Sequence, residues 1–190
     1  MKMLRAHRTR SFGFTLLELM VTLTVVAILG IIAVPSFHAF MLNERRDSVV
    51  DALVASLQYS RNQALNMDQP TTLCAGVSGV PCPGGAWTGG WEVVQQPVSS
   101  STATLLTTHV LQAVSTVPAV RAIDGSTGFT FAGNGLVTFT PALAGGDEII
   151  QVCDARGTAY ARAVEINRAG YIQSSSTLGQ TPGGVALTCP

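Results

Sequence analysis

The sequence predicts an α+β fold in which one long N-terminal helix packs on an antiparallel β-sheet. Two observations carry this prediction. An apolar run begins at Phe14, and apolar residues then recur at three- and four-residue spacing to about Met67. After Asp68-Gln69-Pro70 the pattern changes to short alternating segments separated by residues that favour turns.

The first forty residues combine a basic leader with an apolar segment long enough to span a bilayer. The leader holds four basic residues and no acidic one: Lys2, Arg5, Arg8 and Arg10. A single carboxylate, Glu18, lies inside the apolar run, where an acid is costly and usually functional. A secretory signal peptide would end in small residues after a shorter apolar core, whereas cleavage at Gly13 leaves the apolar segment on the mature chain.

Beyond the membrane segment the helix is expected to be amphipathic. The buried stripe is predicted to comprise Val50, Leu53, Val54, Leu57, Ala64 and Leu65. The opposite, solvated face is predicted to carry Asn43, Glu44, Arg45, Arg46, Asp47 and Arg61. Gly30 lowers helix propensity and Pro35 removes a backbone donor, so the helix is predicted to be weakest between them, either as a kink or as a segment that melts when subunits pack.

The rest of the chain is expected to form short strands at residues 71–75, 91–96, 104–114, 128–132, 136–140, 148–153, 160–166 and 170–173. Gly133-Asn134-Gly135 between two alternating segments is a strong hairpin signal. Residues 76–90 form a long Gly-rich loop. Trp87 and Trp91 are expected to pack in the core beneath it.

The N-terminal segment Gly13-Phe14-Thr15-Leu16-Leu17-Glu18-Leu19 resembles the processing site of type IV pilins and pseudopilins. The resemblance implies cleavage after Gly13 by the prepilin peptidase and N-methylation of Phe14. It also implies that Glu18 serves assembly, by pairing with the new amine of Phe14 in its own chain or in an adjacent subunit. Pro35 falls where many members of this family carry a helix-bending proline.

Further along, the chain resembles the FimT/GspH group of minor pilins and pseudopilins. Its cysteines and the Cys-Asp-x-Arg-Gly stretch make it more similar to FimT-like members. The matching stretches are residues 56–64, 70–74, Trp87 with 90–94, Cys153-Asp154-Ala155-Arg156-Gly157 in 152–157, and 187–190. The family's Gly-Arg-x-Arg motif, which supplies cations to DNA, aligns with Gly170-Tyr171-Ile172-Gln173 and lacks both arginines. Arg156, Arg162 and Arg168 are therefore weak candidates for DNA contacts, and a solvated face of mixed charge is the favoured interpretation.

Charge and cysteines point to an exported domain. The chain has eleven basic and eleven acidic residues, and four of the basic ones lie in the leader. Removal of the leader leaves seven basic against eleven acidic residues, a net charge of −4. DNA-binding proteins normally present a basic surface, so this charge argues against DNA binding. The basic leader places the C-terminal domain in the periplasm, where disulfides persist. The four cysteines allow three pairings, and the short loop between Cys74 and Cys82 favours Cys74–Cys82 with Cys153–Cys189.

These observations predict a prepilin leader at residues 1–13, a transmembrane or filament-core helix at 14–35 and a periplasmic pilin domain at 36–190. The expected function is that of a non-enzymatic minor pilin that contributes to assembly of a type IV pilus. Its partners would be prepilin peptidase, other minor and major subunits, and the inner membrane. A DNA-binding minor pilin and a type II secretion pseudopilin are the alternatives. No catalytic motif, metal-ligand spacing or cofactor signature is present in the sequence, so no cofactor or metal is expected.

Overall fold

The computed structural model describes residues 13–77, 82, 84–96, 102–111, 118–141 and 146–189. Its residues group into two compact units, 1–41 and 42–190. One helix, α1 (Leu16–Met67), contributes to both units and ends where the periodicity predicted. Gly30 and Pro35 both lie inside α1, and the weak point expected between them stays a prediction.

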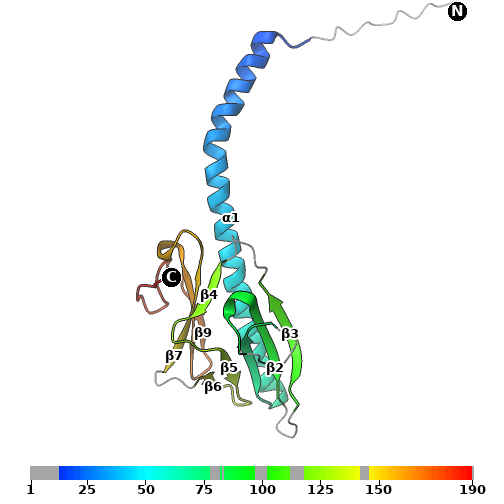
Figure 1. Cartoon of the computed structure of the whole chain (residues 1–190), viewed down its shortest axis with the longest axis vertical. Coiled ribbons are helices and arrows are strands. Elements are labelled where there is room, and N and C mark those ends of the chain that lie inside the picture. The colour runs from blue at the N-terminus through cyan, green and yellow to red at the C-terminus, as the bar shows by residue number, and fades with distance from the viewer. Residues whose placement is uncertain are drawn as a thin grey trace, which may run out of the picture. The chain divides into compact units, whose positions relative to one another are not determined.

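The second unit carries nine strands in its described part: β1 (Thr71–Ala75), β2 (Gly90–Gln95), β3 (Thr104–Val110), β4 (Ala119–Ala122), β5 (Gly128–Phe131), β6 (Val137–Thr140), β7 (Asp147–Cys153), β8 (Arg162–Asn167) and β9 (Ile172–Ser174). All pairings are antiparallel. They form two sheets, ordered β3-β2-β1-β5-β6 and β4-β7-β8-β9. Figure 1 shows both against the C-terminal part of α1.

The predicted α+β class is confirmed, but the expectation of a single sheet is wrong. The chain crosses from the second sheet to the first after β4, which the sequence analysis did not include. Glu148 on β7 holds this crossing: its buried carboxylate accepts hydrogen bonds from the Ser126 hydroxyl and from the Asp124 amide at 3.1 Å. The expected strand at 160–166 begins later, because Thr158–Tyr160 forms a 3-10 turn. Residues 112–114 of the expected strand 104–114 lie outside the described residues.

One hydrophobic core joins the helix to both sheets. From α1 it takes Val49, Val50, Leu53, Leu57 and Ala64, so most of the predicted stripe is buried, whereas Val54 is half-buried and Leu65 is exposed. Trp87 and Trp91 are buried, as expected, and their indole N–H groups donate to the Ser126 carbonyl at 2.7 Å and the Ser56 hydroxyl at 2.9 Å. The hairpin signal is also confirmed, since β5 and β6 pair across residues 132–136.

Candidate functional site

The start of α1 is capped by Thr15, which lies within the predicted processing motif. The Thr15 hydroxyl accepts a hydrogen bond from the Glu18 amide at 3.2 Å, and the Thr15 carbonyl accepts the first helical bond from the Leu19 amide at 3.2 Å. Thr15 is thus the N-cap, and Glu18 occupies the third helical position, where a carboxylate complements the positive end of the helix dipole. Gly13 and Phe14 lie immediately before this cap and are exposed.

This geometry bears on the amine that cleavage after Gly13 would create. A cationic amine on Phe14 would lie beside the positive end of the helix dipole, which repels it. Glu18, one turn further on, is the only acidic residue between Gly13 and Val34. Cleavage at that position would therefore bring one cation and one compensating anion to the same helix end.

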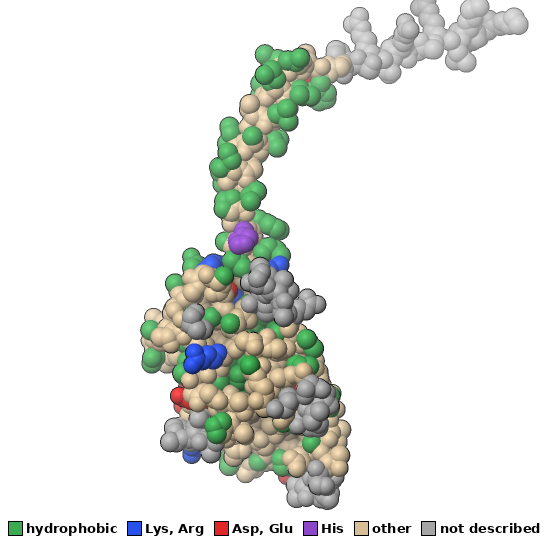
Figure 2. All heavy atoms as spheres, in the orientation of Figure 1, with side chains coloured by type: hydrophobic (Ala, Val, Ile, Leu, Met, Phe, Trp, Pro, Cys, Tyr) green, Lys and Arg blue, Asp and Glu red, His purple; other side chains and the backbone are tan. Residues whose placement is uncertain are grey.

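The apolar half of α1 is uncovered in the isolated chain. Its most apolar 18-residue window has a mean hydropathy of 2.5, is entirely unburied, and is long and apolar enough to cross a membrane. Figure 2 shows hydrophobic side chains along this part of the helix. A shallow groove of about 650 Å³ lies along it, and its walls include Phe37 and Phe40, which are 65% and 55% exposed. An apolar surface of this extent is stable in water only when lipid or another chain covers it.

The first turns of α1 in the second unit carry a charged cluster that the sequence analysis placed in solvent. That expectation is wrong for Arg46, which is 3% exposed. Its guanidinium donates to the Tyr160 carbonyl at 2.9 Å and to both Asp47 carboxylate oxygens at 2.9 and 3.1 Å. Arg162 completes the cluster by donating to Asp47 at 3.2 Å. These hydrogen bonds and ion pairs hold the β7–β8 loop and the start of β8 against α1 near residue 46.

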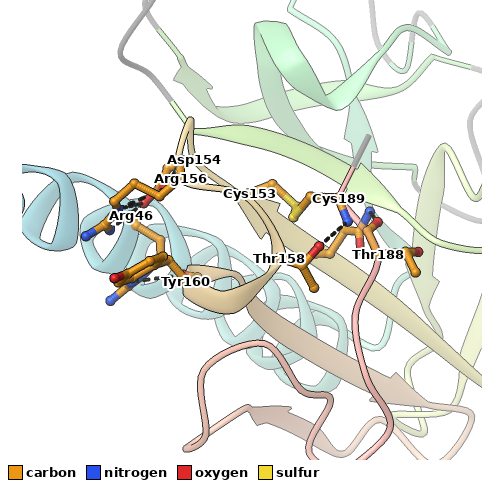
Figure 3. Close-up of a disulfide and its surroundings, with 9 residues drawn as sticks. Arg46, Cys153, Asp154, Arg156, Thr158, Tyr160, Thr188 and Cys189 are labelled. Atoms are coloured by element: carbon orange, nitrogen blue, oxygen red, sulfur yellow. Dashed lines mark hydrogen bonds and ion pairs between the residues drawn. A yellow bond between two sulfur atoms is a disulfide. The ribbon is translucent and has the colours of Figure 1, made fainter.

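The same loop carries a second ion pair, which Figure 3 shows beside a disulfide. Arg156 binds Asp154 at 2.5 Å, donates to the Asn43 side chain at 2.9 Å, and lies over the Tyr160 ring with its guanidinium carbon 4.2 Å from the ring centroid. Asp154 raises the pKa of the Arg156 guanidinium through this hydrogen bond. The tail is tied to the loop as well, because Cys189 bonds to Cys153 and its amide donates to the Thr158 hydroxyl at 3.1 Å.

The carboxylates of Asp47 and Asp154 both have pKa values below their ordinary range. Burial favours the neutral form of Asp47, but the hydrogen bonds and charges of Arg46 and Arg162 outweigh it and lower its pKa. Burial acts in the same direction on Asp154, and Arg156 outweighs it, so that this pKa is lowered too. Both carboxylates are therefore ionised near neutral pH.

The disulfides Cys74–Cys82 and Cys153–Cys189 are the pairs expected from the sequence.

The three candidate DNA contacts are not brought together. Arg156 and Arg162 are engaged by Asp154, Asp47 and the Ser175 carbonyl, at the start of β8. Arg168 follows the other end of that strand, roughly 20 Å away at the usual rise per residue. No DNA-binding surface follows from these three residues.

Comparisons with known proteins give two family matches. A model described as type II transport protein GspH matches residues 49–170, and a model of the prokaryotic N-terminal methylation motif matches residues 8–34. No curated protein matches the chain.

Among solved structures, the chain is similar to the type IV minor pilin FimU of Pseudomonas aeruginosa in two crystal forms. In space group P65 the identity is 23% and the TM-score 0.53, over 71% of this chain and 98% of FimU. In P21 the values are 24% and 0.55, over 75% and 98%. At these identities the likeness is one of fold.

Proposed function

The chain belongs to the GspH family of type II transport proteins, and on this premise we propose that it is a non-enzymatic minor pilin that enters a type IV pilus and contributes to its assembly. The observation that carries the proposal is the uncovered apolar half of α1, which is capped by Thr15 and carries Glu18 in its first turn, directly after Gly13 and Phe14. A GspH-family domain joined to such a helix can leave the lipid bilayer and enter a filament in which similar helices pack together.

The proposed path begins in the inner membrane. The basic leader stays cytoplasmic and the domain enters the periplasm. Prepilin peptidase then cleaves after Gly13, and Phe14 is methylated. In the filament, Glu18 pairs with the Phe14 amine of an adjacent subunit. An unpaired carboxylate in hydrocarbon raises the free energy of insertion by roughly 2.5–3.5 kcal/mol, and the pairing reduces this cost. Because both charges must meet, the pairing also sets the axial register of the subunits.

Replacement of Glu18 tests this role. Glu18→Ala and Glu18→Gln are expected to insert into the membrane as well as wild type, because each removes a buried charge, yet to be depleted from sheared filaments. Glu44→Ala is the matched control, since Glu44 is an exposed acid on the same helix beyond the apolar segment. The measurement is the ratio of filament-bound to membrane-bound protein. Wild-type incorporation of both Glu18 variants would contradict the proposal.

Processing is tested independently by mass spectrometry of the mature protein. The expected first residue is N-methyl-phenylalanine at position 14, and replacing Gly13 with a bulky residue should leave the leader attached without preventing insertion. A mature chain that begins at Met1 or at a later small residue would refute the assignment.

A pseudopilus of type II secretion is the second candidate, favoured by the description of the matching family. Deletion of the gene separates the two when twitching, transformation and protein secretion are scored in parallel. Loss of twitching supports the pilus, and loss of secretion alone supports the pseudopilus. Loss of transformation alone would instead support a role in DNA uptake.

A further inference from the structure

A small polar cavity lies between α1 and the start of β9 within the second unit. Its volume is about 300 Å³, and it is lined by Gln58, Arg61, Asn62, Tyr171 and Ile172. Ligand pockets generally begin at roughly this size. The cavity is thus matched to a single side chain rather than to an extended ligand. Three of its lining residues come from consecutive turns of one helix face, and the other two come from the segment that follows Gly170.

Arg61 is the unusual member of this lining. Its position on the helix predicted a solvated side chain, but Arg61 is half-buried, and its Nε atom is buried without a hydrogen-bond partner among the described residues. No described acid forms an ion pair with it, unlike Arg46, Arg156 and Arg162. A guanidinium stays charged at every physiological pH, and buried donors are almost always satisfied.

Two tight turns confine the Arg61 side chain. Gly135 and Gly170 both have a positive φ. A Cβ added at Gly135 would lie 3.7 Å from Arg61 Nε, and one added at Gly170 would lie 3.1 Å from the same atom. Backbone from two separate loops therefore packs against the guanidinium. An arginine held in this way is preorganised, because it loses little side-chain freedom when a ligand binds.

The chemistry of the lining selects an anion of one charge. Arg61 offers a planar fork of donors and no acceptor, and the exposed amides of Gln58 and Asn62 add donors beside it. A carboxylate matches this fork through two parallel hydrogen bonds. Tyr171 and Ile172 supply apolar surface for the stem of an acidic side chain. The lining contains a single cation, and the mature chain carries net negative charge, which disfavours a polyanion.

We propose that this cavity binds a carboxylate presented by another protein chain, with Arg61 as the principal ligand. Within a filament the carboxylate belongs to a neighbouring subunit, and only that assignment rests on the proposed function. Binding itself is a property of the purified protein, so its failure would leave the filament role standing, and failure of the filament role would leave the site intact.

The test uses the full mature chain in detergent micelles and follows the Arg Nε–H signals by NMR, with the signal of Arg61 assigned from its loss in Arg61→Lys. The probes are a blocked tripeptide, acetyl-Gly-Glu-Gly-amide, its Gln counterpart, dimethyl phosphate and a single-stranded oligonucleotide. The Glu peptide is expected to shift the Arg61 signal saturably, and the Gln peptide is expected to leave it unchanged.

Variants make the assignment specific. Arg61→Gln and Arg61→Lys are expected to weaken binding of the Glu peptide at least roughly tenfold, since each loses the bidentate fork. Binding to these variants is followed through backbone amide signals of Tyr171 and Ile172, whose dispersion also shows that the domain is folded. Arg121→Gln, at an exposed arginine on β4, is expected to bind like wild type. No saturable shift with the Glu peptide would overturn the proposal, as would tighter binding of dimethyl phosphate or of the oligonucleotide, which would assign the cavity to phosphodiesters.

Discussion

Replacing Arg46 with alanine is expected to lower the free energy of unfolding of the domain by about 2–4 kcal/mol. The variant leaves the Tyr160 carbonyl without the donor that now lies 2.9 Å away. Loss of a hydrogen bond from a charged donor contributes about 1.5–3 kcal/mol, and the lost packing of the aliphatic stem adds to it. Asp47 contributes less, at most about 1 kcal/mol, because its side chain is 37% exposed and it keeps Arg162 as a partner.

The assay is urea unfolding of the mature protein in detergent, followed by the fluorescence of the buried Trp87 and Trp91. Thermal unfolding of the same variant gives a second readout, and for a domain of this size its midpoint temperature should fall by at least roughly 4 °C. Arg46→Lys separates charge from geometry, since an ammonium group cannot serve Tyr160 and Asp47 with the same planar fork, and it should recover only part of the loss.

Arg121→Ala is the matched control, because Arg121 is an exposed arginine on β4, away from this cluster. Its expected change is within about 0.5 kcal/mol of wild type. If Arg46→Ala and Arg121→Ala unfolded at the same urea concentration, the contacts between the β7–β8 loop and α1 would contribute nothing to stability and the reasoning would fail.

Two further predictions concern acid and backbone geometry. The pKa values of Asp47 and Asp154 are lowered from 3.8 by folding, so their stabilisation is present above about pH 4 and is lost as the pH falls through the lower folded values. Unfolding midpoints measured from pH 6 to pH 2 should show this loss, and the double variant Asp47→Asn with Asp154→Asn should flatten it; an unchanged acid dependence would refute the assignment. Gly170→Ala should destabilise the domain by at least about 2 kcal/mol, because φ is +76° and the new Cβ would collide with the Gly135 carbonyl oxygen. Gly146→Ala, with open space around the new Cβ, is its control in the same urea assay, and equal midpoints would count against the argument.

The elements set by local pattern were predictable from the sequence. The end of α1 at Met67 follows from helical spacing that stops before Pro70, and the β5–β6 hairpin follows from its Gly-Asn-Gly turn. The division into two sheets was not predictable, because alternation shows which face of a strand is buried and not which strand lies beside it. Strand β4 escaped notice because Val120 is its only β-branched residue and it has no aromatic one, whereas β5 and β6, of the same length, each combine Phe with Thr.

The charged clusters show the same limit at the level of side chains. Helical spacing alone assigned Arg46 to solvent, yet its main acceptor is Tyr160, 114 positions later in the chain. Arg61 depends likewise on turns at Gly135 and Gly170. Both positions are decided by contacts that only the folded chain creates, so no reading of the helix by itself could find them.

The strand order also determines when each strand's pairing partner becomes available as the polypeptide is made. Every strand of the first sheet precedes Pro141 in the chain, whereas β4 must wait for β7 before it gains a partner. Cys82 follows Cys74 by 8 positions, so the first disulfide can close early, whereas Cys153 must wait 36 positions for Cys189. The disulfide that ties the β7–β8 loop is consequently the later of the two, and a chain that stops short of Cys189 would have α1 and the first sheet but would lack this covalent tie.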